Sequence, residues 1–166
     1  EKILTKTAMK NSLLTKKTSE TKKTALMLAK NLIKKHGQKH ALIIALSGNL
    51  GSGKTTFVQG FAKGLGIKEI PKSPTFILMQ IFELGIRNYE LGIRNLVHID
   101  AYRLKKPKEL LHLGFQEIIR DPHNIVVIEW AEKMKKLLPK DTMWIYFKHA
   151  GKNKRKIIIN YPTNYE

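Results

Sequence analysis

The stretch SGNLGSGKTT at residues 47–56 constrains the fold more than any other part of the sequence. Gly48, Gly53, Lys54 and Thr55 complete the pattern Gly, four residues, Gly, Lys, Thr without a mismatch. Glycines at these places let the backbone wrap tightly and turn its N–H groups inward, which is the geometry that cradles phosphate groups. The pattern carries this meaning only where a strand precedes it and a helix follows it. The fold must therefore supply a strand, this loop and a helix in direct succession.

The flanking residues meet that condition. Residues 41–48, ALIIALSG, are a short apolar run of the kind expected for a strand buried on both faces. Residues 54–66 read as a helix stopped by Gly64 or Gly66. We therefore predict a nucleotide site, because the backbone N–H groups and the positive end of the helix dipole favour bound phosphates. The predicted nucleotide-binding residues of the loop are Asn49, Leu50, Gly51, Ser52, Gly53, Lys54, Thr55 and Thr56.

Two of these side chains have separate predicted roles. Lys54 adds a mobile positive charge for the terminal phosphates, and the hydroxyl of Thr55 is placed to ligate Mg²⁺. A glycine turn that happens to fit the pattern is the plainer alternative. The strand before the loop and the helix after it make that alternative the weaker interpretation.

Along the rest of the chain, predicted strands and helices alternate, which predicts an α/β protein with a mainly parallel sheet. We expect a three-layer fold of the P-loop NTPase type, with helices flanking the central sheet and antiparallel C-terminal strands. Residues 1–18 are expected to be a basic, flexible segment, and residues 19–166 a single domain. The expected elements are helices within 19–37, 107–121 (two short pieces) and 131–139, and strands within 73–82, 95–100, 124–130 and 141–161 (two strands around a turn).

Positive charge is concentrated at the two ends of the chain. The formal net charge is +18. Residues 1–40 hold 11 Lys and 2 Glu (+9), residues 133–166 hold 9 basic and 2 acidic residues (+7), and residues 41–132 hold 11 and 9 (+2). Both ends could help to hold an anionic partner such as RNA. A simple preference for surface lysine is the favoured interpretation, because lysine, isoleucine and asparagine are abundant in this sequence. No aromatic residues are interleaved with the basic runs, which weakens the case for a surface that stacks bases.

The composition excludes several classes of protein. The chain has no cysteine, which excludes disulfides and thiolate metal sites and fits a reducing cytosol. No apolar run approaches the roughly 20 residues of a membrane span. We therefore expect a cytoplasmic protein that makes no contact with a membrane.

A near-perfect duplication lies at residues 82–95, where FELGIRN is followed by YELGIRN. It falls between two predicted strands, where a hairpin loop tolerates an insertion at small entropic cost. A neutral insertion is the favoured interpretation, and a loop that contacts a specific partner is the alternative.

Two predicted strands end in carboxylates. The stretch LVHID ends at Asp100, and IVVIE ends at Glu129. An apolar strand closed by an acid is the Walker B arrangement, which places a carboxylate beside the phosphate cradle. Thr75, in KSPTF at 72–76, lies one loop after the first helix of the site, where P-loop proteins place a switch segment. Taken singly, a solvated strand cap or a common turn would also explain these residues.

In their order along the chain, GNLGSGKTT, SPTF, HIDAYRL, LGFQEI and VVIEW resemble the bacterial TsaE family, also called YjeE. The resemblance runs from about Ser19 to Lys133. Members of this family are small ATPases of the machinery that makes threonylcarbamoyladenosine in tRNA. This sequence departs from the family slightly, with Ala131 where proline is usual and Ser52 where alanine is frequent. Neither departure removes a chemical group from the predicted site.

The resemblance implies ATP and Mg²⁺ as cofactors and a weak ATPase activity controlled by the partners TsaD and TsaB. It implies that this protein acts on tRNA only indirectly. Direct contact between tRNA and the basic termini stays an open alternative. Thr75 would be the switch threonine, and Asp100 and Glu129 would serve the metal and the attacking water. The sequence leaves that assignment open, and we favour Glu129 with Thr55 for Mg²⁺ and Asp100 for water.

The resemblance also gives roles to the neighbours of these acids. Trp130 would lie near the nucleotide, although a core aromatic is an equal alternative. His98, Tyr102 and Arg103 would support the site or contact a partner.

Two other functions fit the phosphate cradle. A small-molecule or nucleoside kinase shares it, but such enzymes usually add an arginine-rich lid, and this chain has five arginines, two of them in the duplication. A non-catalytic nucleic-acid-binding module would fit the charged ends. The intact set of Lys54, Thr55, Asp100 and Glu129 opposes it. We therefore favour the partner-controlled ATPase.

Overall fold

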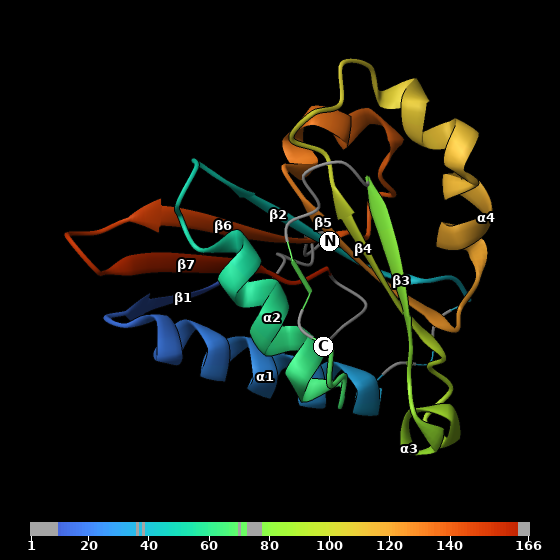
Figure 1. The fold of residues 1–166 in the computed structure, drawn as a ribbon, viewed down its shortest axis with the longest axis horizontal. Coiled ribbons are helices and arrows are strands. Elements are labelled where there is room, and N and C mark those ends of the chain that lie inside the picture. The colour runs from blue at the N-terminus through green and yellow to red at the C-terminus, as the bar shows by residue number, and fades with distance from the viewer. Residues whose placement is uncertain (1–9, 36, 38, 70, 73–77, 163–166) are drawn as a thin grey trace, which may run out of the picture.

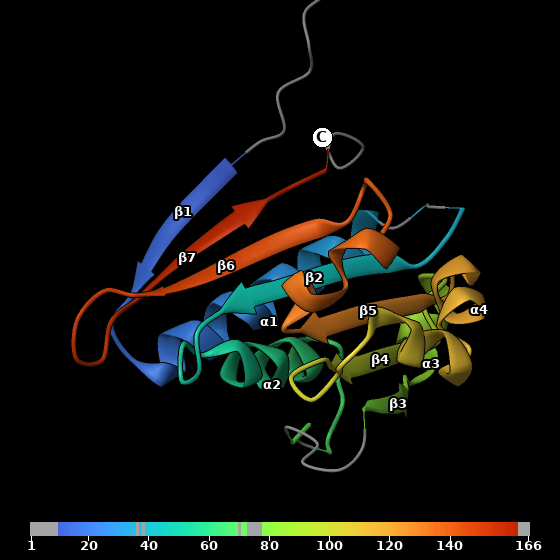
Figure 2. The same cartoon turned by 90° about the horizontal axis from the view of Figure 1, so that it is seen from above.

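The fold is a seven-stranded sheet with helices on both faces (Figures 1 and 2). The structure is a computed structural model, and it describes residues 10–35, 37, 39–69, 71–72 and 78–162. The strands lie in the order β1-β7-β6-β2-β5-β4-β3. The strands are β1 (Lys10–Thr15), β2 (Leu42–Gly48), β3 (Met79–Glu83), β4 (Asn95–Asp100), β5 (Asn124–Glu129), β6 (Met143–His149) and β7 (Arg155–Asn160). The helices are α1 (Thr18–Lys35), α2 (Lys54–Gly64), α3 (Ile86–Glu90) and α4 (Phe115–Arg120), with 3-10 helices η1 (Pro107–Leu113) and η2 (Ala131–Leu137).

The centre of the sheet is parallel and its margins are antiparallel. Strands β6, β2, β5 and β4 run parallel to one another, whereas β7 pairs antiparallel with β6, and β3 with β4. Strand β2 is central because its apolar run, Leu42 to Leu46, is buried along its whole length. Such a run suits a strand that is covered on both faces. The predicted three-layer α/β fold with antiparallel C-terminal strands is confirmed.

The two helical layers cover opposite faces of the sheet (Figure 2). Helices α1 and α2 pack on one face, over a core cluster that includes Ile44 and Val127. Helices η1, α4 and η2 cover the other face, over a cluster that includes Ile43 and Val126. No helix in the described part of the chain has the length and hydropathy that a bilayer crossing requires.

Part of the expected flexible N-terminal segment is instead a strand. Residues 10–15 form β1, which pairs antiparallel with β7 from Lys10 opposite Asn160 to Thr15 opposite Arg155. The Thr15 and Thr21 hydroxyl oxygens lie 2.9 Å apart, which ties the strand to α1. The expectation was wrong here because pairing along the β7 edge supplies hydrogen-bond partners that are far away in sequence. Residues 1–9 lie outside the described residues.

Two other expected elements differ in detail. The helix expected within 131–139 is the 3-10 helix η2, broken at Met134, whose φ of −123° is not helical. This local break accompanies complete burial of the Met134 side chain in the core beneath η2. The strand expected within 73–82 is described only as β3, and residues 73–77, which include Thr75, lie outside the described residues.

The two copies of the duplicated heptapeptide adopt different structures. The first runs from β3 into α3, and the second runs from α3 into β4. Leu84 from the first copy and Ile93 from the second are both buried in the same core cluster. The buried Asn88 side chain donates a hydrogen bond to the carbonyl oxygen of Leu65 at 2.8 Å. The hairpin between β3 and β4 was expected, and its connection is packed against the body of the domain.

Close packing of α1 on α2 depends on small residues. A Cβ atom at Gly60 would lie 2.3 Å from the backbone oxygen of Lys22. We expect Gly60→Ala to lower the free energy of unfolding by about 1–3 kcal/mol, because the helices must separate to admit the methyl group. Urea unfolding measures this change.

Gly85→Ala is the matched control. No heavy atom lies within 4 Å of a Cβ there, and φ is −73°. Its effect should stay within about 0.5 kcal/mol. Equal effects of the two alanine substitutions would contradict the close packing at Gly60.

Candidate functional site

The glycine-rich loop joins the end of β2 to the start of α2 at the carboxyl edge of the parallel strands. Gly51 and Gly53 have φ values of 70° and 102°, which side-chain-bearing residues rarely adopt. A Cβ atom at Gly48 would lie 2.6 Å from the carbonyl oxygen of Phe147 on β6. The strand, loop and helix therefore occur in the succession that the motif requires, and the glycines are needed for the shape of the loop.

The Lys54 ammonium lies inside this loop. Its Nζ donates hydrogen bonds to the carbonyl oxygens of Gly48 at 2.6 Å and Asn49 at 3.0 Å. It also lies 3.9 Å from the centroid of the Trp130 ring, a cation–π contact. Burial lowers the pKa of Lys54 below its usual value, and the nearby carboxylates, led by Glu129, act in the opposite direction. The charge is thus desolvated and held where an incoming anion would meet it.

The carboxylate of Glu129 is the centre of the site. Its Oε2 accepts a hydrogen bond from the Thr55 hydroxyl at 2.8 Å, and its Oε1 lies 2.9 Å from Nε2 of His98. The side chains of His98 and Glu129 are 0% and 2% exposed. The contact joins the start of α2 to the ends of β4 and β5. The hydroxyl and the carboxylate predicted to serve Mg²⁺ are therefore in direct contact.

Asp100 lies beside Glu129 because the two residues are opposite each other in the parallel pairing of β4 with β5. The backbone N–H of Tyr102 donates to its Oδ1 at 2.9 Å. The next residue along, Ala101, donates its N–H to the carbonyl oxygen of Glu129 at 3.0 Å. The structure therefore brings the two strand-end acids to one edge of the sheet, as the sequence pattern suggested.

Trp130 follows directly after Glu129 in a left-handed conformation. Its φ of 57° is the only positive value at a non-glycine residue in the described part of the chain. Its ring centroid lies 5.0 Å from that of Tyr102 at an interplanar angle of 46°. Lys133 in turn donates to the carbonyl oxygen of Tyr102. This turn ends β5 at the acid and places the indole over Lys54.

A polar cavity of about 470 Å³ opens beside the loop. It lies between the glycine-rich loop, the start of α1 and the turn from β6 to β7. Arg155 lines it and donates from Nη2 to the carbonyl oxygen of Gly51 at 3.1 Å. Thr18 and Thr56 add hydroxyl groups to its wall. The cavity offers a cation and hydrogen-bonding groups next to the phosphate cradle.

The chemistry of the residues present suits magnesium with a nucleotide better than a metal held by protein alone. Within the described ranges, no group of three or more histidine, aspartate and glutamate side chains is placed to hold a metal ion. Mg²⁺ is commonly bound by one or two carboxylates together with substrate phosphates and water. Thr55 and Glu129 match that donor set. The buried Ser52 hydroxyl oxygen, which has no partner among the described residues, is a further polar atom in the cradle.

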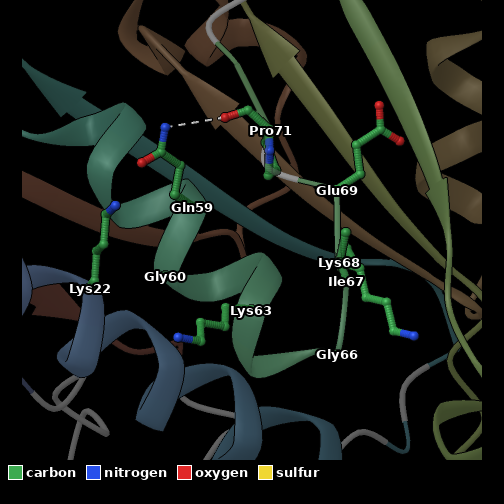
Figure 3. Close-up of a pocket in the computed structure, with 9 residues that line it drawn as sticks. All are labelled: Lys22, Gln59, Gly60, Lys63, Gly66, Ile67, Lys68, Glu69 and Pro71. Carbon is green, nitrogen blue, oxygen red and sulfur yellow. Dashed lines mark hydrogen bonds between the residues drawn. The ribbon is translucent and has the colours of Figure 1, made fainter.

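A second cavity, of about 570 Å³, lies between α1, α2 and the loop that follows α2 (Figure 3). Gln59 donates to the carbonyl oxygen of Pro71 at its upper edge, at 3.4 Å. The side chains of Lys22 and Lys63 lie at the left of the view, whereas the Lys68 side chain extends to the right. None of the residues that line this cavity belongs to the phosphate cradle or the acidic pair.

The structure places most of the predicted site residues together. Lys54, Thr55, Asp100, Glu129 and Trp130 gather at the carboxyl edge of the sheet. Leu50 is 75% exposed and points its apolar side chain to solvent. Asn49, also exposed, contributes its carbonyl oxygen to Lys54. The remaining loop residues lie within the segment that connects β2 with α2: Gly51, Ser52, Gly53 and Thr56.

Sequence reasoning missed two contacts. His98 was given only a supporting role, although its position two residues before Asp100 puts both side chains on one face of β4. That alternation was a usable signal. Arg155 was not assigned to the site, and no local pattern could have placed it there, because it reaches Gly51 from 104 positions away.

Comparisons with known proteins agree with this geometry. The family model described as threonylcarbamoyl adenosine biosynthesis protein TsaE matches residues 15–157. The curated tRNA threonylcarbamoyladenosine biosynthesis protein TsaE of Bacillus subtilis is 37% identical over 122 residues, covering 74% of this chain and 71% of the relative. The protein of the same name from Rickettsia prowazekii is 37% identical over 142 residues, covering 85% and 88%. A crystal structure of Bacillus subtilis YdiB matches with a TM-score of 0.67 and 29% identity, covering 93% of this chain and 87% of that one.

The buried contacts of Glu129 predict a clear difference between two substitutions. Glu129→Ala leaves the buried Nε2 of His98 without its acceptor and opens a cavity, so we expect the free energy of unfolding to fall by about 2 kcal/mol. Glu129→Gln keeps one acceptor and adds an amide donor that the Thr55 hydroxyl can accept, so it should lose less. Urea unfolding without nucleotide measures both. The control is Glu132→Ala on the exposed side of η2, and an equal loss in all three variants would contradict the assignment.

Proposed function

The chain belongs to the TsaE family, and we propose that it binds Mg²⁺-ATP, hydrolyses it slowly, and serves tRNA threonylcarbamoyladenosine biosynthesis by regulating a TsaB–TsaD complex. The relatives named above support the pathway, because they are tRNA threonylcarbamoyladenosine biosynthesis proteins. The observation that carries the proposal is the phosphate cradle, with Lys54 inside it and Thr55 hydrogen-bonded to Glu129.

Binding begins at the phosphates. The backbone N–H groups of the loop and the start of α2 attract the anion. Lys54 exchanges its contacts with the carbonyl oxygens of Gly48 and Asn49 for phosphate oxygens, which are stronger acceptors for an ammonium. Magnesium, when bound, neutralises charge on the phosphate oxygens, and the residues that would hold it are Thr55 and Glu129. The nucleoside end of ATP then has the polar cavity beside Gly51 and Arg155 available to it.

Glu129 and Asp100 have different roles in the proposed hydrolysis. We assign Glu129 to the metal, because its Oε2 already accepts from the Thr55 hydroxyl. Asp100 is assigned to the attacking water, because it lies at the same edge, opposite Glu129, on the neighbouring strand. Its Oδ1 accepts from the N–H of Tyr102, which fixes the direction of the carboxylate. A carboxylate held in this way can orient a water molecule for attack.

A contact at Tyr102 gives a partner protein a way to change the nucleotide site. Tyr102 is exposed, and its ring contacts Trp130, whose indole covers the Lys54 ammonium. A protein that contacts Tyr102 would change the position of Trp130 and so the environment of Lys54. This route supports regulation by a TsaB–TsaD complex without requiring that the chain itself modify tRNA.

Hydrolysis assays test the proposal. We expect slow release of phosphate from Mg²⁺-ATP by the protein alone and an altered rate when TsaB and TsaD are added. Lys54→Ala should weaken ATP binding, because the cradle loses its cation. Asp100→Asn should leave ATP binding in place and reduce turnover about 100-fold or more, as expected when a residue that orients water is lost. Lys30→Ala on the exposed side of α1 is the control.

Two results would redirect the proposal. Binding of ATP with no hydrolysis in any mixture would make the loop a nucleotide-dependent docking element, as in a non-catalytic module. Transfer of phosphate to a small acceptor would instead favour a kinase.

Tryptophan fluorescence tests the contact of Trp130 with Lys54. The chain has 2 tryptophans, so Trp144→Phe leaves Trp130 as the only one. Adding Mg²⁺-ADP should change its emission, because phosphate draws the ammonium away from the indole at 3.9 Å. The control is the same titration in a protein that carries both Trp144→Phe and Lys54→Ala, at ADP concentrations that saturate this weaker binder. An unchanged spectrum on saturating Trp144→Phe would show that the indole does not sense the nucleotide.

A further inference from the structure

We propose that His98 is a positioning residue for the metal side of the nucleotide site, and that it acts by fixing the rotation of the Glu129 carboxylate. The proposal rests on the function proposed above, because it concerns how Glu129 meets Mg²⁺. It assigns His98 no contact with the nucleotide and no part in the chemical step.

His98 and Thr55 contact different oxygens of the Glu129 carboxylate. His98 lies on β4 opposite Val127, and Glu129 lies two residues further along β5. Both side chains therefore occupy the face of the sheet that α2 covers. Nε2 of His98 lies 2.9 Å from Oε1 of Glu129, and the Thr55 hydroxyl is 2.8 Å from Oε2. Each carboxylate oxygen thus has its own partner, one on the neighbouring strand and one on the helix.

This arrangement removes the rotational freedom that a glutamate normally has. The last torsion of a glutamate side chain is broad, so an unrestrained carboxylate samples many orientations. Rotation of Glu129 would break a charge-assisted hydrogen bond to a fully buried imidazole, and such bonds are roughly twice as strong as neutral ones. His98 therefore keeps Oε2 directed at Thr55. Partners that orient a metal ligand in this way are known to tune metal affinity.

The Lys54 ammonium is a second group that attracts this carboxylate. Of the carboxylates that influence the pKa of Lys54, Glu129 has the strongest effect. A Glu129 side chain without His98 would be free to turn toward that ammonium, which would remove it from the metal position. The hydrogen bond from His98 opposes this turn and keeps the two charges in separate roles, Lys54 for phosphate and Glu129 for the metal.

The other ring nitrogen of His98 identifies the residue that orients the imidazole. Because Nε2 faces a carboxylate oxygen, it carries a hydrogen and donates to Glu129. Nδ1 is buried and has no hydrogen-bond partner among the described residues, and the same is true of Oε1 of Gln80. Gln80 lies directly opposite His98 in the pairing of β3 with β4, so their side chains share a face. The Gln80 amide is therefore the neighbouring group placed to orient the imidazole from the side away from Glu129.

A purely structural role for His98 would predict a different outcome, so the test separates the two. His98→Leu has similar size and no donor, and His98→Gln restores a donor at the same reach. His123, paired with Asp121 at 2.8 Å, supplies the matched control His123→Leu, a second histidine–carboxylate pair remote from the loop. The dissociation constant of ADP is measured by titration calorimetry in EDTA and in Mg²⁺, and the ratio of the two constants is the magnesium gain.

We expect His98→Leu to reduce the magnesium gain about tenfold or more, in line with the loss of other partners that orient metal ligands. His98→Gln should recover most of the gain, and His123→Leu should keep all of it. ADP affinity in EDTA should change much less than the magnesium gain, because His98 does not touch the phosphate cradle and the metal contact of Glu129 contributes only when Mg²⁺ is present. A full magnesium gain in His98→Leu, together with a lower melting temperature, would overturn the proposal and leave His98 a structural residue.

A measurement on the unaltered protein guards against variants that do not fold. Nitrogen-15 NMR of the imidazole rings reports Nε2 and Nδ1 of His98 directly. Adding Mg²⁺ to the ADP complex should shift the His98 signals and leave those of His123 in place. Unmoved His98 signals would overturn the proposal. Failure of the unaltered protein to bind ADP would overturn the proposed function itself, and that result is distinct because it appears before any variant is compared.

Discussion

A buried carboxylate at Glu129 is the constraint on which the rest of the site depends. An ionised carboxylate removed from water is costly unless both of its oxygens are hydrogen-bonded. Here one oxygen accepts from Thr55, the first residue after Lys54 in α2, and the other meets His98 on β4. These two contacts set how the start of the helix lies against the ends of the two strands. A change in any of the three side chains therefore affects both the fold and the nucleotide site.

The same edge of the sheet carries the cation of the site. Lys54 is held by two carbonyl oxygens of its own loop and by the face of Trp130, so it is ordered before any ligand arrives. Its lowered pKa shows that burial costs the charged form more than the neighbouring carboxylates return. An arriving phosphate would offset that cost, and a site ordered in advance loses little conformational freedom on binding. The left-handed backbone of Trp130 belongs to this arrangement, because strained conformations of this kind cluster at functional sites.

Local patterns were sufficient for the elements that carry the motifs. The apolar run before Gly48 is a buried strand, the residues after Gly53 are a helix, and Asp100 and Glu129 each end a buried strand. Each of these follows from composition and period within a dozen residues. The prediction was wrong where distant segments decide the outcome. Residues 10–15 are a strand only because β7 offers its edge, and η2 departs from an α-helix where Met134 turns into the core.

By itself, the sequence determined the phosphate-binding loop, the order of strands and helices around it, and the carboxylates at the strand ends. Backbone sterics favour glycine at positive φ, and a strand buried on both faces favours apolar residues, so both features can be recognised from short stretches of sequence. Only the tertiary structure decided which side chains of the site contact one another. It set the pairing of Glu129 with His98, the approach of Arg155 to Gly51 and the placing of Trp130 over Lys54. These contacts join residues that are tens of positions apart, and they depend on strand order and helix packing, which no local pattern specifies.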